Sequence, residues 1–497
     1  MPGGVSLGLG VLVVGAVGLL AVLSNRVGAW TRVPVPALFL AVAALASDLV
    51  PSLYRLPTAD LESIVSVALV LILFEGGMTI GWGRLRPLLG AVGLVGIVGT
   101  LLTAAGVALA AHGLFGFDWR TALLIGTALS PTDPAVVFSV LGSRVIPGPA
   151  GTLLEGESGA NDPVGIALLL ALVALDPAAP SSVGAAAVSV LGTFALQLAV
   201  GLAVGVAGGL ALARLMARVA LPAAGLYPVR TLAGALAVYG LATVAHGSGF
   251  LAVLAAGVVV GDVRAPFAVE IRQFHAALSS LGEIVAFTLL GLSISLRSLR
   301  TGDALWIGLG LALLLTFVIR PLVVGPLLLA VRRLTAGERV FVTWAGLKGA
   351  VPILLGVLAT AGARANEGNT LVYDVIVVPV VFSVLVQGST VGVVARWCRV
   401  PMSVVEERGW ASGLRFAEPP DRIAHLGVEA GAAAVGARLD GLALPAGMSL
   451  GLVVRGGQPV PAQPDTVLRV GDEVVIVGDP GDHDRARALF RSAAGSQ

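Results

Sequence analysis

Two carboxylates and a hydroxyl in apolar parts of the chain have the types and spacing of an ion-binding site. Asp162 lies four residues after Ser158, so on a helix the two side chains share a face. Asp133 stands in an earlier apolar stretch, and it closes the same site if the two stretches cross. Their oxygens are hard ligands, which suit Na⁺, K⁺ and protons. One cysteine and five unclustered histidines argue against a transition-metal site.

Helix-breaking residues surround the polar residues of two apolar segments. Prolines enclose Thr132 and Asp133, and glycines enclose Lys348 shortly before Pro352. Proline removes a backbone donor and glycine loosens a helix, so we expect both segments to be interrupted near their middle. Lys348 would then offset the negative helix ends where the segments cross. Asp133 has two interpretations, cation binding and capping of its broken helix.

These segments belong to a chain that is too apolar to be a soluble globule. Of its 497 residues, 57% are hydrophobic and 12% are charged, against about 25% charged residues in soluble proteins. The net charge of +2 gives no indication of nucleic-acid binding. Stretches near the length of a membrane span predict about thirteen transmembrane helices. They lie near 5–24, 33–50, 59–80, 87–112, 119–141, 150–175, 184–213, 229–246, 248–262, 268–295, 303–330, 339–361 and 371–395.

The order of the spans predicts an all-helical polytopic membrane protein with inverted repeats. If spans one to six and eight to thirteen form two halves, each half has its broken helix in fifth position. That pattern is expected of a secondary transporter whose site lies at the repeat interface. Arginines are concentrated in alternate loops, which places the N-terminus outside and the C-terminal region in the cytoplasm.

The composition changes after the last span. We expect a transmembrane domain over 1–400, a linker over 401–420 and a small cytoplasmic α/β domain over 421–497. In the last of these, Met448–Arg455 and Val467–Val477 are expected to be strands, and Asp482–Arg491 a terminal helix.

Five motifs, in order along residues 5–400, resemble the monovalent cation:proton antiporter-1 family, the NhaP-type and sodium/proton-exchanger lineage. They are F-E-G-G at 74–77, T-D-P at 132–134, E-S-G-A-N-D at 157–162, V-I-R-P around Arg320 and G-L-K-G-A-V-P at 346–352. The resemblance implies a homodimer in which each protomer has a dimer domain and a moving core domain. It also implies that Asp162 is the carrier, which binds either a proton or a cation.

The same resemblance implies roles for the surrounding residues. The cation and proton site would be completed by Asp133, Thr132, Ser158 and Glu75, with Asn161 beside the carrier. An Asn-Asp pair resembles the electroneutral branch of the family.

Four further charges are interpreted as structural. Glu157 would pair with Arg320, because a buried acid that faces a base neutralises itself. Glu283, which matches an acid in the family's tenth span, is likewise assigned a structural role. Lys348 stands where the family usually has Arg, so the charge is kept without the guanidinium fork.

The C-terminal region resembles the TrkA-C subdomain of potassium-channel regulators. The match runs through V-G-A-R-L-D-G-L-A-L-P at 435–445 and L-R-V-G-D-E-V-V-I-V-G at 468–478. Antiporters with this tail are often potassium/proton exchangers, and some related tails bind cyclic di-AMP. The resemblance therefore favours K⁺ and a regulatory role for the tail.

The sequence thus predicts a proton-coupled antiporter of a bacterial plasma membrane that works by alternating access. It would exchange K⁺ for protons without a cofactor and would not be an enzyme. One alternative is a Na⁺/H⁺ antiporter. Another is a regulated K⁺ channel, which the absence of a T-V-G-Y-G filter disfavours. A membrane hydrolase is disfavoured by the absence of H-E-x-x-H and G-x-S-x-G.

Overall fold

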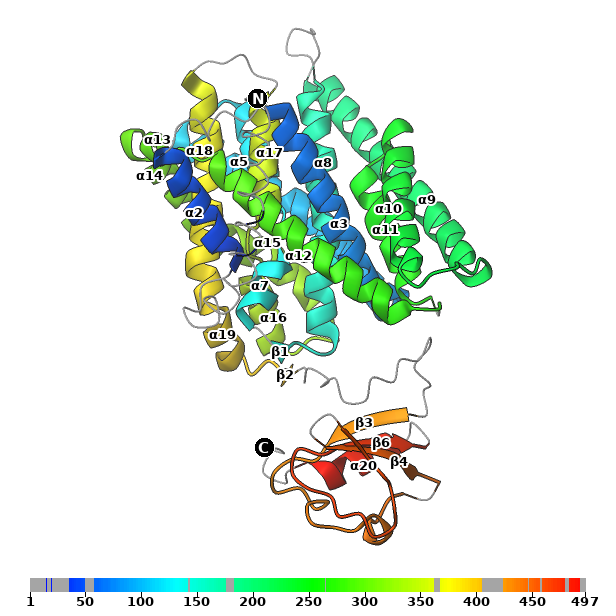
Figure 1. The fold of residues 1–497 in the computed structure, drawn as a ribbon. Coiled ribbons are helices and arrows are strands. Elements are labelled where there is room, and N and C mark those ends of the chain that lie inside the picture. The colour runs from blue at the N-terminus through cyan, green and yellow to red at the C-terminus, as the bar shows by residue number, and fades with distance from the viewer. Residues whose placement is uncertain are drawn as a thin grey trace, which may run out of the picture. The chain divides into compact units, whose positions relative to one another are not determined.

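The structure is a computed structural model in which the chain forms two compact units, the first ending at Val404 (Figure 1). The residues that it describes are Gly15, Leu19, 35–49, 58–141, 144–175, 183–263, 265–361, 367–404, 423–445, 447–455, 458–478 and 482–491. Most of the first expected span, at 5–24, and most of the expected linker lie outside them.

The first unit is almost entirely helical. Its helices are α2 (Val35–Leu49), α3 (Thr58–Leu85), α4 (Leu89–Val92), α5 (Thr100–Phe115), α6 (Trp119–Ala128), α7 (Pro134–Leu141), α8 (Pro149–Val173), α9 (Val183–Arg218), α10 (Leu226–Val244), α11 (Gly249–Gly261), α12 (Ala268–Leu292), α13 (Leu296–Thr301), α14 (Ala304–Leu314), α15 (Arg320–Leu329), α16 (Ala336–Trp344), α17 (Ala350–Ala361), α18 (Glu367–Phe382) and α19 (Gly388–Trp397). The short strands β1 (Arg144–Val145) and β2 (Ser403–Val404) pair antiparallel.

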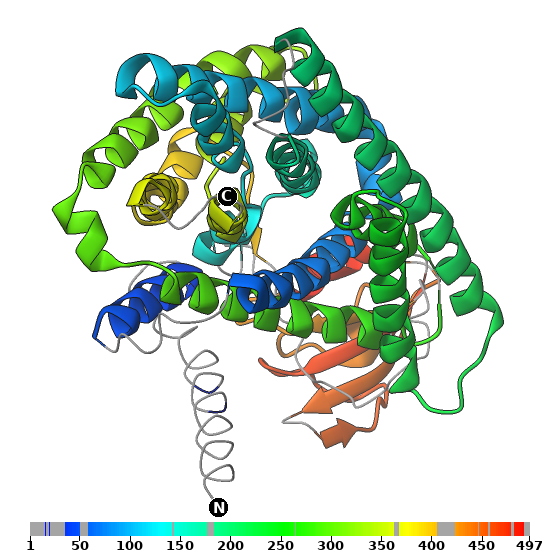
Figure 2. The ribbon, with the colours of Figure 1, turned by 90° about the horizontal axis from the view of Figure 1, so that it is seen from above.

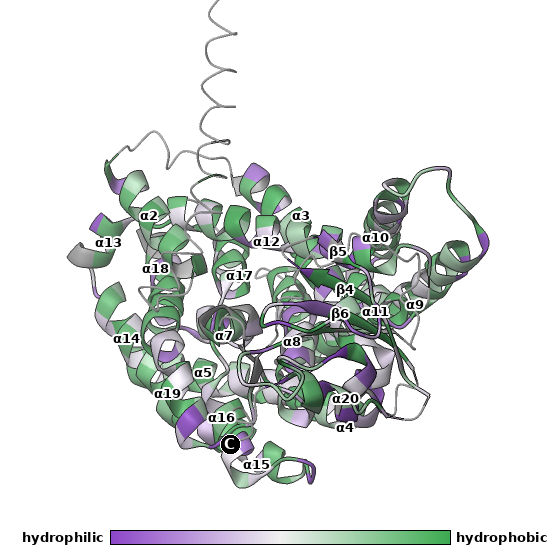
Figure 3. Ribbon diagram, turned by 60° about the horizontal axis from the view of Figure 1, so that its bottom comes forward, coloured by the Kyte–Doolittle hydropathy of each residue, from purple (hydrophilic) through white to green (hydrophobic). Residues whose placement is uncertain are grey.

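Hydrophobic residues make up most of the helices of the first unit, as the colours of the ribbon show (Figure 3). Leu109, Trp306 and Leu322 are each more than half exposed in the structure, as expected of surfaces that lipid covers. Among the described residues, five helical segments are long and apolar enough to cross a membrane: Asp60–Phe115, Gly184–Arg218, Ala268–Leu292, Ala304–Leu329 and Leu371–Trp397. The chain is therefore a multi-pass membrane protein, while the count of about thirteen spans stays a prediction.

Both interruptions expected from the prolines and glycines are present. Residues 129–133 leave the helical conformation between α6 and α7, and residues 345–349 do so between α16 and α17. Each break divides a membrane-length apolar segment into two shorter helices. The break thereby frees backbone groups in the interior of the unit.

Close backbone contact holds α3 against α11. A Cβ at Gly77 would overlap the carbonyl of Leu254, and a Cβ at Gly257 would overlap the carbonyl of Phe74. Figure 2 shows that α3 and α12, which are distant in the sequence, also run side by side; a Cβ at Gly282 would lie 3.1 Å from the carbonyl oxygen of Ala68.

Near its end, α3 is kinked at Gly81, whose φ of 63° favours glycine. The carboxylate of Asp262, at the end of α11, accepts a 2.5 Å hydrogen bond from the amide of Gly83. This contact ties the kink in α3 to the end of α11.

Three helices of the first unit contain a π-helical segment, namely η2 (Gly93–Gly99), η3 (Leu315–Ile319) and η4 (Ser383–Gln387). Each widens the helix by one residue and shifts the side-chain register beyond it. Arg320 follows η3 directly, and η4 contains Ser383, which contacts the second break.

The second unit contains a small antiparallel sheet with the strand order β3-β6-β4-β5. Its elements are β3 (Ile423–Gly427), β4 (Ser449–Arg455), β5 (Gln458–Val460), β6 (Glu473–Val477) and α20 (His483–Phe490). Side chains from the sheet and α20, including Val453, Ile476 and Phe490, form its hydrophobic core. The mainly helical first unit and the C-terminal sheet domain agree with the expectation.

One expected strand of the second unit is too long. Only Glu473–Val477 of the expected Val467–Val477 is a strand. Before it, Gly471 has a φ of 83° and the carboxylate of Asp472 accepts a hydrogen bond from the amide of Arg469, so the chain turns there.

Candidate functional site

The two interrupted segments cross, and each one satisfies backbone groups of the other. The amide of Asp133 donates to the carbonyl of Leu347 over 2.8 Å. In the opposite sense, the ammonium of Lys348 donates to the carbonyls of Ser130 and Pro131, at 3.1 and 2.9 Å. These carbonyls follow the end of α6, where the helix dipole is negative. Lys348 is 2% exposed and lies where the two segments cross.

The carboxylate of Asp133 lies against the start of α17. A Cβ at Gly349 would overlap the Asp133 carboxylate, so only glycine fits at this position. The positive end of α17 is therefore next to an acid, as the negative end of α6 is next to a base. The contact with the start of α17 agrees with a capping role for Asp133. A cation-binding role also agrees with the structure, because the same side chain lines the cavity described below.

Thr132 and Asn161 bond to one another beside the crossing. The amide nitrogen of the Asn161 side chain donates to the hydroxyl of Thr132 at 2.7 Å, and the backbone amide of Thr132 donates to the Asn161 side-chain oxygen at 3.2 Å. Both side chains are buried, and neither lines the cavity. In this structure the pair attaches the first break to α8.

The expected ion pair between Glu157 and Arg320 is formed, with 2.9 Å between Arg320 Nη2 and Glu157 Oε1. Their side chains are 3% and 4% exposed. The guanidinium also donates to the carbonyls of Thr343 and Val342, at the end of α16. A Cβ at Gly346 would overlap the guanidinium, so the glycine of the second break makes room for it.

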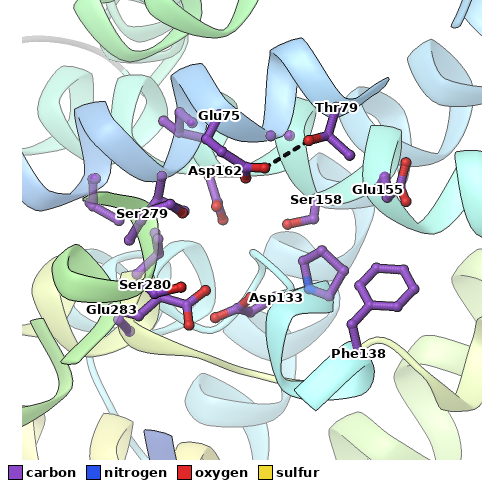
Figure 4. Close-up of a pocket in the computed structure, with 18 of the residues that line it drawn as sticks. Glu75, Thr79, Asp133, Phe138, Glu155, Ser158, Asp162, Ser279, Ser280 and Glu283 are labelled. Carbon is purple, nitrogen blue, oxygen red and sulfur yellow. Dashed lines mark hydrogen bonds between the residues drawn. The ribbon is translucent and has the colours of Figure 1, made fainter. Parts of the chain in front are cut away.

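A cavity of about 430 Å³ lies beside the first break, which contributes Asp133 to its wall (Figure 4). Four of the expected site residues line it, namely Glu75, Asp133, Ser158 and Asp162. The polar lining is completed by Thr79, Glu155, Ser279, Ser280 and Glu283. None of the described lining residues is Lys, Arg or His. The polar part of the described lining therefore consists of hydroxyls and several carboxylates without a base, and apolar side chains such as Leu69, Phe138 and Phe287 form the rest of the wall.

The carboxylates of the cavity differ in their partners. Glu75 accepts a 2.7 Å hydrogen bond from Thr79, and Glu155 forms a 3.0 Å ion pair with Arg84. Asp162 is 8% exposed, and its Oδ1 has no hydrogen-bond partner among the described residues. A buried carboxylate in this condition needs a proton or a cation to balance its charge.

Four polar lining residues were not identified from the sequence. Thr79 lies four residues after Glu75, and Ser279 lies four residues before Glu283, so each pair shares a helix face. Glu155 lies three residues before Ser158 on α8. Ser280 lies three residues before Glu283, so same-face spacing around residues already selected would have found all four.

Crossed half-helices beside a cavity with several carboxylates and no base among its described lining residues define a membrane protein of the ion-transporting class. The profile of the family described as sodium/hydrogen exchanger, transmembrane, matches residues 12–397. The chain belongs to this family. A second profile, that of the TrkA-C domain, matches residues 426–491, which include β4, β5, β6 and α20.

Relatives extend the match over most of the chain. A protein named K⁺/H⁺ antiporter NhaP from Alkalimonas amylolytica is 32% identical over 81% of this chain and 69% of its own length. A K⁺/H⁺ antiporter NhaP2 from Shewanella oneidensis is 29% identical over 98% of this chain and 83% of its own length.

A solved structure has the same fold. The sodium proton antiporter MjNhaP1 from Methanocaldococcus jannaschii superposes with a TM-score of 0.64 at 21% identity, covering 78% of this chain and 98% of that one.

Proposed function

We propose that this protein exchanges protons for a monovalent cation across a bacterial plasma membrane, and that K⁺ is the favoured cation. The observation that carries the proposal is Asp162, a buried carboxylate whose Oδ1 has no hydrogen-bond partner among the described residues and which lines a cavity with several other carboxylates. The names of the two K⁺/H⁺ antiporter relatives and the TrkA-C match support K⁺.

Exchange follows from competition at one carboxylate. Asp162 holds either a proton or a cation, because both neutralise the same charge. Asp133, Ser158 and Glu75 supply further oxygens from the cavity wall. Thr132 and Asn161 keep the first break in place through their mutual hydrogen bonds. Alternating access then carries the two ions in opposite directions, and the ion gradient drives the cycle.

The ion pair of Glu157 with Arg320 and the contacts of Lys348 have a structural role in this proposal. They balance charge inside the unit without occupying the cavity. The remaining architecture proposed here is about thirteen spans in two inverted repeats, a homodimer and a regulatory tail in the cytoplasm. The domain limits are 1–400, 401–420 and 421–497, and cyclic di-AMP is the nucleotide to test on the tail.

Purified protein in liposomes that contain a pH dye tests this function. A proton gradient is imposed, and K⁺ or Na⁺ is added outside. Dissipation by K⁺ supports the proposal, and dissipation by Na⁺ alone identifies a Na⁺/H⁺ antiporter. Cation flux without proton counter-flow would indicate a channel. If neither cation dissipates the gradient, with or without cyclic di-AMP, the transport proposal fails.

A further inference from the structure

The cavity has two facing sets of polar residues, and α12 contributes one of them. Ser279, Ser280 and Glu283 come from α12, whereas Asp133 and Asp162 come from the first break and from α8. Figure 4 shows the carboxylates of Asp133 and Glu283 turned toward one another across the cavity. From the sequence, Glu283 was assigned only a structural role.

Glu283 lacks the contacts of a structural acid. Among the described residues it has no hydrogen bond and no ion pair, and the charged groups that act on it are the carboxylates of Asp133 and Glu75. The structural acid Glu157 is bonded to Arg320 instead. Removal of a carboxylate from water is costly unless a base or several donors replace the water. Glu283 is partly buried, lines the cavity and has neither among the described residues.

A second unbalanced carboxylate faces the same space. Asp162 Oδ1 is buried without a partner in the described part of the chain, and it lines the same cavity of about 430 Å³. At about 30 Å³ for each water molecule, the cavity has room for a cation that keeps part of its hydration shell. Two such carboxylates within one cavity can each be neutralised by a cation.

We propose that Glu283 and Ser279 form a second cation-binding position on α12, which the ion occupies in exchange for a proton on its way to or from Asp162. Ser279 and Glu283 share a helix face, so a hydroxyl and a carboxylate oxygen are available to one ion. When the cation arrives, the O–H bond of the Glu283 carboxyl breaks, and the proton passes to water in the cavity. The inference rests on the proposed antiport function.

The groups that face Glu283 set the pH dependence of this step. They are Glu75 on α3, Asp133 at the first break, and Glu155 and Asp162 on α8. The one base that acts on Asp162, Lys348, does not line the cavity. Cation binding at Glu283 should therefore strengthen as the pH rises and the carboxyl loses its proton.

Glu283→Gln tests the position, because glutamine keeps the shape but cannot exchange a proton. In the liposome assay we expect exchange to persist, with the KM for K⁺ raised roughly tenfold or more, as for loss of a charged ligand. The dependence of KM on pH should also become shallower. Glu283→Asp keeps an ionisable group and should restore the pH dependence. Glu270→Gln, also on α12 but outside the cavity lining, is the matched control.

A wild-type KM and pH profile in Glu283→Gln would overturn the inference and leave the proposed function standing. If this variant does not fold, Glu283→Asp decides alone: a changed KM supports the second position, and an unchanged KM rejects it. If the wild type itself does not exchange, the proposed function fails. Calorimetric titration of K⁺ into wild type and Glu283→Gln in detergent then tests binding directly, and equal proton release would reject the second position.

Discussion

The buried charges outside the cavity lining have partners in the protein, whereas two of the charges that line the cavity have none in the described part of the chain. Outside the lining, Arg320 bonds Glu157, and Lys348 bonds two carbonyls that end a half-helix. In the cavity, Asp162 and Glu283 have no such partner among the described residues. A charge that the protein balances itself stabilises the fold, whereas a charge left facing a cavity requires an ion from outside.

The strongest test of this difference is Asp162→Asn. Asparagine has the same shape but cannot hold a proton, so we expect a folded protein whose exchange falls about 100-fold or more. The liposome assay measures exchange, and size-exclusion chromatography in detergent measures folding. Asp303→Asn changes an exposed acid outside the cavity and should exchange normally. Normal exchange by Asp162→Asn would remove the carrier role.

Loss of one member of the ion pair should affect stability more than transport chemistry. Arg320→Met leaves Glu157 as a buried charge, so the expected destabilisation is about 3–5 kcal/mol. Thermal unfolding in detergent measures it. The double variant Glu157→Gln with Arg320→Met should regain much of the stability. If the double variant is as unstable as Arg320→Met alone, the partnership of the two residues contributes little to stability.

A smaller effect is expected where Gly349 of the second break contacts Asp133 of the cavity wall. Gly349→Ala pushes a methyl group into the Asp133 carboxylate, and overpacking of this kind costs about 1–3 kcal/mol. We expect the exchange rate to fall roughly tenfold, because a free-energy cost of about 1.4 kcal/mol corresponds to a factor of about ten. Gly240→Ala, on α10, meets no atom within 4 Å and serves as the control. Equal activity of the two variants would contradict the role given to this glycine.

The smallest effect concerns a charge pair outside the membrane unit. In the tail, a hydrogen bond from the Arg455 guanidinium lowers the pKa of Asp472 below its usual value. The carboxylate therefore contributes stability above the unfolded pKa of about 3.9, and this contribution is lost as the pH falls through the lowered value. Solvent screens the partly exposed guanidinium, which limits the gain.

Pepsin cleavage of the tail in the full-length protein, followed from about pH 4 to pH 2, measures this contribution. Wild-type protein should become more sensitive as the pH falls, whereas Asp472→Asn should be sensitive throughout. Identical pH profiles for the two proteins would show that the pair does not stabilise the tail.

Local chemistry made part of this structure predictable. Prolines around Thr132 and glycines around Lys348 indicated both helix breaks, because these residues act on their own backbone. The ion pair of Glu157 with Arg320 followed from motifs of the family, and the carrier role of Asp162 stays a prediction from the same motifs. These features depend on short stretches of sequence or on residues that the family resemblance already pairs.

Contacts between distant segments could not be predicted in this way. Nothing in the sequence around Asn161 specifies Thr132 as its hydrogen-bond partner, and nothing around Glu283 shows that α12 faces the first break. The turn at Gly471 shortened a strand because Asp472 bonds the amide of Arg469, a choice that hydrophobic alternation does not reveal. Such features arise from tertiary packing.

The π-helical segment η3 has a consequence for how this chain can vary in length. Arg320 follows it directly, and each residue of a helix turns the next by about 100°. A one-residue deletion in Leu315–Ile319 would keep every charged side chain, yet it would rotate either the guanidinium or the preceding helix away from its present neighbours. The number of residues between the motifs therefore matters for this fold as much as the identity of the motif residues.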